Sequence, residues 1–159
     1  MNKQELNDRD LALKLFVVLT KAHKAIAEAV TKDIRKTGLN PTEFAVLELL
    51  YHKGEQPIQK IGKKVLISGS SITYVIDKLE EKQYIERRAC PKDRRVTYVL
   101  MTESGRQMMR SIFPAHAMTI EEILDGLNKK EKEDCIILLK KLGIKAEGWI
   151  RESREPDHT

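Results

Sequence analysis

The densest positive charge in this 159-residue chain lies in one short segment. From Arg87 to Arg95 there are five basic residues and one acidic residue, a net charge of +4, against +5 for the whole chain. Lysine and arginine bind phosphate oxygens, and a basic tip on a nearly neutral body is typical of proteins that neutralise phosphates locally. Taken alone, this basic cluster also fits a solvated hairpin whose charges protect its strand edges from aggregation.

A second group of polar side chains precedes the basic cluster. Between positions 68 and 78, hydroxyl residues, a tyrosine and a lysine are interspersed with apolar residues at helical spacing. On a helix, Ile72, Val75 and Ile76 would face the core and the polar residues would face solvent. Hydroxyl and ammonium groups on such a face can bind base edges and phosphates, and small residues let the backbone approach closely. The same pattern also fits an ordinary helical hairpin.

The two cysteines, Cys90 and Cys135, are too few for a disulfide framework or a four-ligand metal site. We therefore expect no cofactor and no structural metal. Cys90 lies within the basic cluster, which makes a redox-active thiol the alternative chemistry for this segment. Cys135 falls on an apolar helical stripe, where we expect an inert core residue.

Several protein classes are disfavoured by what the sequence lacks. It has no glycine-rich phosphate loop, no paired acid and base and no nucleophile elbow, so we do not expect an enzyme. The first residues lack the basic start and apolar stretch of a signal peptide, and no segment approaches the roughly 20 apolar residues of a membrane span. We expect a cytoplasmic protein without membrane contact.

These polar groups must be positioned by helices, which apolar spacing predicts along most of the chain. Residues 11–34 form one long amphipathic pattern, and the Asn-Pro-Thr-Glu segment at 40–43 supplies the cap, proline and glutamate that begin a second helix. A short third helix over about 58–65 and a turn over 66–69 lead into the helix that carries the hydroxyl residues. Two short helices joined by a tight turn fit a helix-turn-helix.

A basic β-hairpin is predicted directly after this helix. Residues 84–89 and 96–101 alternate in strand fashion, and the turn residues 90–95 join them. Thr102 then caps a long helix, and an Asn-Lys-Lys-Glu segment at 128–131 begins the last one. The expected fold class is mainly α with a small antiparallel β-hairpin, in the order of a winged helix-turn-helix with long N- and C-terminal helices.

With these elements placed, residues 11–142 resemble the MarR (multiple antibiotic resistance regulator) family. The segment 93–102 is similar to the family's wing signature, an Asp-x-Arg followed by a strand that ends in Leu-Thr, although Met101 stands before Thr102 here. The segment 67–82 is similar to the family's recognition helix. Residues 83–85 depart from the family pattern, since Gln-Tyr-Ile stands where Gly-Leu-Ile is usual.

The resemblance implies a homodimer in which the first helix and the last two pack against those of the partner. The apolar stripes of these helices agree, because exposed stripes of that size usually mark an interface. We expect a single domain over 1–159, with a DNA-binding lobe at about 40–102 and dimerisation helices at 8–37 and 103–148. The expected partners are a second copy and double-stranded DNA with near-palindromic half-sites about one helical turn apart.

The resemblance also points to the DNA-binding residues. Arg95 would enter the minor groove from the wing, and Asp93 would orient its guanidinium. Arg88, Lys92 and Arg94 are expected to contact phosphates. On the recognition helix and its start, the expected major-groove contacts are Ser68, Ser70, Ser71, Thr73, Tyr74 and Lys78.

The expected function is that of a sequence-specific transcription regulator, a repressor released from its operator by a small phenolic or aromatic effector. The family holds effectors between the long helices and the winged lobe, where His23, His52 and His116 are candidate lining residues that also suit structural roles. The alternatives are a redox sensor that uses Cys90, although the family's peroxide sensors carry a cysteine at the first helix instead, and a protein-interaction winged helix. A wing with an Asp-x-Arg favours DNA, and an aromatic content of 5% disfavours RNA.

Overall fold

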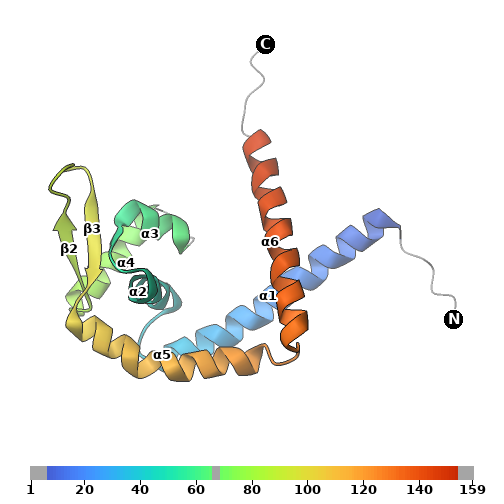
Figure 1. The fold of residues 1–159 in the computed structure, drawn as a ribbon, viewed down its shortest axis with the longest axis horizontal. Coiled ribbons are helices and arrows are strands. Elements are labelled where there is room, and N and C mark those ends of the chain that lie inside the picture. The colour runs from blue at the N-terminus through green and yellow to red at the C-terminus, as the bar shows by residue number, and fades with distance from the viewer. Residues whose placement is uncertain (1–6, 66–68, 154–159) are drawn as a thin grey trace, which may run out of the picture. The chain divides into compact units, whose positions relative to one another are not determined.

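The computed structural model describes residues 7–65 and 69–153. The chain forms two compact units, Met1–Ile120 and Glu121–Thr159, and each is described by itself. The elements of the first unit are, in chain order, α1 (Asp8–Arg35), α2 (Pro41–Lys53), β1 (Gln56–Pro57), α3 (Ile58–Lys64), α4 (Gly69–Glu81), β2 (Ile85–Ala89), β3 (Thr97–Met101) and α5 (Glu103–Ile123), whose last residues belong to the second unit (Figure 1). The second unit holds α6 (Lys129–Glu152).

The sheet is antiparallel with the strand order β1-β3-β2, so β3 lies in the middle. Gln56 of β1 and Arg87 of β2 both pair with Val99. The β2–β3 hairpin agrees with the sequence prediction to within one residue at each strand start, but β1 was not predicted. A two-residue strand is too short for alternation to show, and Pro57, which lacks an amide donor, is tolerated because β1 lies at the sheet edge. The predicted fold class, mainly helical with a small antiparallel sheet, is confirmed.

Two capping boxes begin helices where the sequence predicted them. Asn40 Oδ1 accepts from the Glu43 amide at 2.8 Å, while the Asn40 amide donates to Glu43 Oε2 at 3.1 Å. Asn128 and Glu131 repeat this arrangement at the start of α6. The α2 helix ends at Gly54, whose φ of 73° lies in the left-handed region that favours glycine. Each N-terminal cap stabilises its helix by about 1 kcal/mol.

The core of the first unit lies between α2, α3, α4 and the sheet. Each of these elements contributes fully buried side chains, among them Phe44, Leu47, Ile61, Ile76, Leu79, Ile85 and Val99. Burying one such side chain stabilises the fold by roughly 1.5–3 kcal/mol. The α4 helix is therefore held by its apolar face, and its opposite face stays at the surface.

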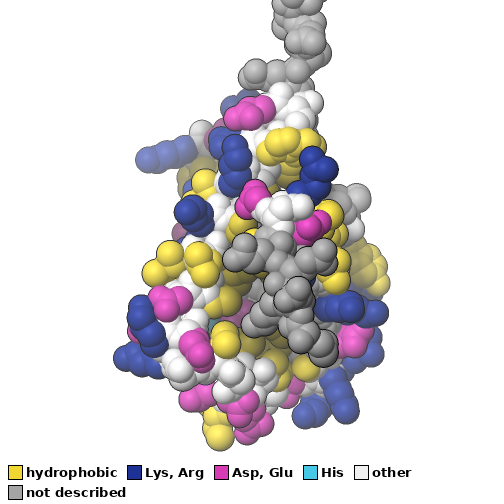
Figure 2. All heavy atoms as spheres, turned by 90° about the vertical axis from the view of Figure 1, so that its right-hand side faces the viewer, with side chains coloured by type: hydrophobic (Ala, Val, Ile, Leu, Met, Phe, Trp, Pro, Cys, Tyr) yellow, Lys and Arg dark blue, Asp and Glu magenta, His cyan; other side chains and the backbone are white. Residues whose placement is uncertain are grey.

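Large apolar side chains lie exposed along α1 and α6 in this single chain. In α1, Leu15 is 49% exposed and Phe16 is 68% exposed. Within Lys129–Glu152, all of which the structure describes, no residue is buried, and Cys135 is half-buried rather than in a core as predicted. Figure 2 shows hydrophobic side chains at the surface among charged ones. None of the described helices is long and apolar enough to cross a membrane.

Candidate nucleic-acid interface

The surface of α4 carries the predicted hydroxyl residues. Ile72, Val75, Ile76 and Leu79 face the core, which turns Ser71, Thr73 and Tyr74 outward, and all three are exposed. Ser70 lies in the first turn of α4, and Ser68 lies outside the described residues. The structure thus places Ser71, Thr73 and Tyr74 on one end of one helix, opposite the core.

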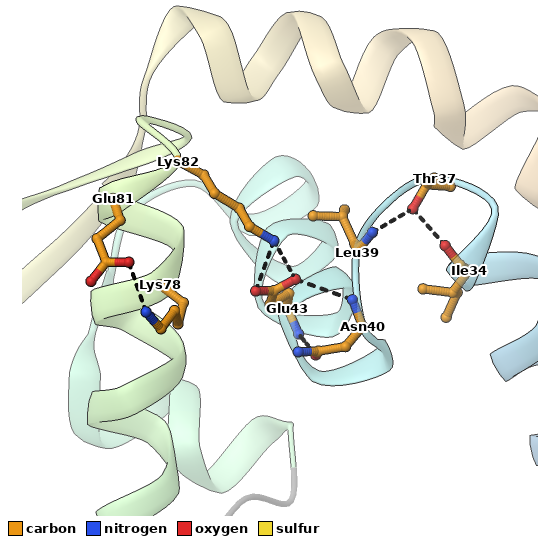
Figure 3. A network of polar contacts seen from close by, with 8 residues as sticks. All are labelled: Ile34, Thr37, Leu39, Asn40, Glu43, Lys78, Glu81 and Lys82. Carbon is orange, nitrogen blue, oxygen red and sulfur yellow. Dashed lines mark hydrogen bonds and ion pairs between the residues drawn. The ribbon is translucent and has the colours of Figure 1, made fainter.

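Lys78, predicted to contact DNA, already has a partner within its own helix. Its Nζ lies 2.8 Å from Glu81 Oε2 and 5.7 Å from the centre of the Tyr74 ring. Figure 3 shows the contact between Lys78 and Glu81. The hydrogen bond to Glu81 raises the pKa of Lys78, so the ammonium stays charged. To bind a DNA phosphate, Lys78 would have to release the Glu81 carboxylate.

The turn of the wing joins Asp93 to Arg95, as the sequence predicted. Asp93 Oδ1 accepts from the Arg95 amide at 3.0 Å and from its Nε at 3.1 Å, and Asp93 Oδ2 accepts from the guanidinium at 3.1 Å. The bonds to Arg95 hold the pKa of the Asp93 carboxyl below its usual range. The Arg95 side chain is 91% exposed. A fully charged guanidinium is therefore directed by its neighbour and stays open to solvent.

The other basic residues of the cluster fall into two groups. Arg88 pairs with Glu55, and Arg87 pairs with Asp77 and Glu80 of α4. Lys92 and Arg94 have no carboxylate partner among the described residues, and both are exposed. The net charge read from the sequence therefore overstates the positive charge of the strand itself. The uncompensated part lies at the tip of the wing.

The C-terminal end of α4 is fixed by an ion pair to α2 and by a backbone turn. Lys82 Nζ donates to both carboxylate oxygens of Glu43, at 2.9 and 2.8 Å, and this buried carboxylate also belongs to the capping box of α2 (Figure 3). Gln83 has a φ of 61°, and the Tyr84 amide donates to the Leu79 carbonyl at 3.0 Å, which is a Schellman-type helix end. The family's usual glycine at position 83 suits this φ, and glutamine adopts it here.

The base of the wing is joined closely to α5. The Thr102 amide donates to the Tyr84 carbonyl at 3.0 Å, and the Thr102 hydroxyl donates to the Gln83 carbonyl at 2.6 Å. A Cβ on Gly105 would lie 2.1 Å from the same Tyr84 oxygen, so only glycine fits. Sequence patterns did not identify this requirement, because it depends on two segments that meet only in the fold.

The three histidines considered for an effector site lie in different surroundings. His116 is buried, its Nδ1 lies 2.9 Å from Asp33 Oδ2, and its ring centre lies 4.5 Å from that of Phe44. His52 is exposed and its ring lies 4.7 Å from Phe113. His23 lines an open depression whose described lining belongs to α1 alone. His116 thus has a structural role, which the sequence left open.

Comparison with known proteins gives consistent matches. The MarR family profile matches residues 39–97, which span the helix-turn-helix and most of the hairpin. The chain is 53% identical over 135 residues to the HTH-type transcriptional regulator MhqR of Bacillus subtilis (strain 168), covering 85% of this chain and 93% of that protein. It is 27% identical over 119 residues to the transcriptional repressor MprA of Escherichia coli (strain K12), covering 74% and 68% respectively.

Solved structures share the fold at low sequence identity. AbsC, a MarR family transcriptional regulator from Streptomyces coelicolor, has a TM-score of 0.79 at 19% identity and covers 92% of this chain and 99% of its own. A mutant of MarR from E. coli, complexed with operator DNA, has a TM-score of 0.74 at 17% identity and covers 86% and 99%. The winged-helix architecture with long terminal helices is therefore shared across these proteins.

Proposed function

The chain belongs to the MarR family of DNA-binding transcription regulators, and from this premise we propose that it is a homodimeric repressor of a near-palindromic operator. The observation that carries the proposal is the placement of an exposed hydroxyl face and an exposed basic wing tip on one packed lobe. The hydroxyl end of α4 and the Asp93–Arg95 pair of the wing both project from the core that α2, α3 and the sheet enclose. Repression is supported by the likeness to MprA, a transcriptional repressor.

Each element has a distinct part in reading DNA. The start of α4, with Ser70, Ser71, Thr73 and Tyr74, enters the major groove, where small hydroxyls bind base edges or phosphates. Arg95 enters the minor groove, where a guanidinium held by Asp93 senses the negative potential of a narrow groove. Lys92 and Arg94 at the wing tip contact phosphates, as do Arg88 and Lys78 once their carboxylate partners are exchanged.

The homodimer is formed by the long helices at each end of the chain. The apolar residues exposed on α1 and α6 are too many for a monomer, and a second copy would bury them. A dimer also presents two winged lobes, and a twofold axis between them requires two related half-sites on DNA. Residues 8–37 and 103–148 would then act as the dimerisation helices and about 40–102 as the DNA-binding lobe.

A small aromatic effector would release the dimer from its operator. The support for an aromatic ligand is a group of rings between α2 and α5. The ring centres of Tyr51 and His52 lie 5.9 and 4.7 Å from that of Phe113. Planar rings of this kind stack on aromatic molecules. A ligand there would alter how α5 packs on α2. Because Glu43 of α2 bonds Lys82 at the end of α4, this change would reach the recognition helix α4.

Substitution of Arg95 tests the reading role of the wing. Arg95→Ala should lower affinity for a selected palindromic duplex by about a hundredfold, because an inserted charge is lost while the exposed side chain supports no core. Gel-shift titrations on two duplexes that differ only in flanking A·T content should show a reduced preference for A·T flanks. Lys92→Ala should instead weaken binding to both duplexes alike, as a phosphate contact does.

Circular dichroism and light scattering provide the controls for folding and for the dimer. If Arg95→Ala binds both duplexes as tightly as the wild type, the wing does not read DNA. In that case the protein-interaction role becomes the better assignment for this winged helix.

A further inference from the structure

Arg87 differs from the other basic residues of the wing in the direction it faces. Side chains alternate along β2, so Arg87 lies on the same face as Ile85, which is buried in the core. Its side chain is 28% exposed, against 57% for Arg88 and 91% for Arg95. Its guanidinium donates to two residues of α4, through Nη2 to Asp77 Oδ1 and through Nη1 to Glu80 Oε2. The residue therefore faces the recognition helix rather than solvent.

The last turns of α4 carry an excess of negative charge that Arg87 offsets. Asp77, Glu80 and Glu81 stand against a single cation, Lys78, within the same helix. Carboxylates at a helix C-terminus also add to the negative end of the helix dipole. A helix with this charge would be repelled by the phosphates on both sides of a major groove, and Lys78 can neutralise only Glu81, its bonded partner.

We propose that Arg87 is a positioning residue for DNA binding, which neutralises the acidic side of the recognition helix and ties that helix to the wing. The proposal rests on the proposed function, because it concerns how the two reading elements act together. The forked guanidinium bonds two carboxylates one turn apart on α4 while its backbone belongs to the β2–β3 ladder. We call Arg87 with Asp77 and Glu80 the clamp. It holds α4 and the wing at a fixed spacing, so that α4 can lie in the major groove while Arg95 lies in the minor groove.

This role differs from that of a phosphate contact in a way that can be measured. A phosphate contact acts directly, so its removal lowers the salt dependence of binding and does not depend on Asp77 or Glu80. A clamp acts through its carboxylate partners, so its removal matters only while those partners are charged. A double-mutant cycle separates the two cases.

The experiment measures DNA affinity and its salt dependence for Arg87→Gln in two backgrounds. In the wild-type background, affinity for the selected duplex should fall about tenfold, which corresponds to the pairwise coupling usual for such contacts. In the Asp77→Asn, Glu80→Gln background, Arg87→Gln should change affinity by less than about twofold. The log-log salt slope should stay as in the wild type in both backgrounds. Arg87→Lys, which cannot bond both carboxylates in the same fork, should fall between wild type and Arg87→Gln.

Arg110→Gln is the matched control. This variant also removes an arginine from an ion pair, because Arg110 Nη1 lies 3.4 Å from Glu103 Oε1. Both residues of that pair lie on α5 rather than on the recognition helix α4. Its DNA affinity should equal that of the wild type. Urea unfolding of every variant shows that each is folded under the binding conditions.

Three results would overturn the proposal, and each is distinct. Equal losses in both backgrounds, with a smaller salt slope, would make Arg87 a phosphate contact. A loss of unfolding free energy with no change in DNA affinity would leave it a purely structural ion pair. If the wild-type protein itself binds no duplex from a random pool, the proposed function fails, and the role of Arg87 in DNA binding fails with it.

Discussion

The winged lobe and the terminal helices bury their apolar residues in opposite ways. In the lobe, Leu47, Ile61, Ile76 and Val99 are fully buried within one chain, and the polar contacts between α2, α4 and the wing are made within the same chain. Along α1 and α6, residues of the same type, such as Leu15 in α1, lie about half exposed. The core of the lobe is therefore closed within one chain, with Ile34 of α1 and Met109 of α5 packed into it, whereas much of the apolar surface of α1 and α6 stays exposed in the single chain.

This difference separates two consequences of mutation. A change in the lobe should act on folding or on DNA contact and leave assembly intact. A change on the exposed apolar face of a terminal helix should act on assembly first, because no core of the single chain depends on it.

The largest effect is expected from a charge on the apolar face of α1. Leu15→Glu should weaken the homodimer at least a thousandfold, or about 4 kcal/mol, because an unpaired carboxylate would be buried in the interface. Light scattering should report the chain mass of 18.3 kDa rather than twice that value. Lys21→Glu, a charge reversal on the same helix, is the control and should stay dimeric. A dimeric Leu15→Glu would show that this face is not the interface.

The next effect concerns two glycines, one in each region. Gly105→Ala should destabilise the fold by about 3 kcal/mol, because the new Cβ would lie 2.1 Å from the Tyr84 carbonyl oxygen. Gly143→Ala in α6 meets no described atom within 4 Å and should stabilise the helix by up to about 1 kcal/mol. Urea unfolding measures both changes. Equal effects at the two positions would contradict the difference between the regions, and a loss at Gly143 would place a partner chain against it.

The smallest effect is a pH dependence at the end of α1. The hydrogen bond with His116 lowers the pKa of Asp33, so the bond stabilises the fold above the unfolded carboxyl pKa, and this contribution is lost as pH falls through the lower folded pKa. At pH 7, Asp33→Asn should cost about 1.5 kcal/mol.

The difference from wild type should shrink steadily below about pH 4. Urea unfolding across pH measures it. Asp134→Asn is the control, because its exposed pair with Lys130 should contribute less than about 1 kcal/mol. A difference that is constant with pH would show that Asp33 acts by packing rather than by charge.

Local signals in the sequence predicted most of the fold. The capping residues Asn40 and Asn128 and the strand alternation placed element boundaries to within a few residues, because each depends on neighbours in the chain. The β1 strand was missed, since two residues carry no periodic signal. The expectation that Cys135 is a core residue failed for the single chain, because periodicity identifies an apolar face but not what covers it.

The candidate site was only partly predictable for a related reason. The Asp93–Arg95 pair lies two residues apart within the wing signature, so the resemblance to the family predicted a contact between the two side chains. The carboxylate partner of Arg87 lies on α4 and that of Arg88 lies beside β1. Because these segments are distant in sequence, the net charge of the segment treated both arginines as unpaired. Residues that bring distant segments together, such as Gly105 beneath Tyr84, have no local pattern and become visible only in the fold.

The stoichiometry of the complex with DNA tests most directly whether the terminal helices pair two winged lobes to read one operator. Native mass spectrometry of the wild-type protein, titrated onto a selected palindromic duplex, should show two chains of 18.3 kDa per duplex at every degree of saturation. No species with one chain per duplex should accumulate. A stable complex of one chain with one duplex, formed before the second chain binds, would contradict this account.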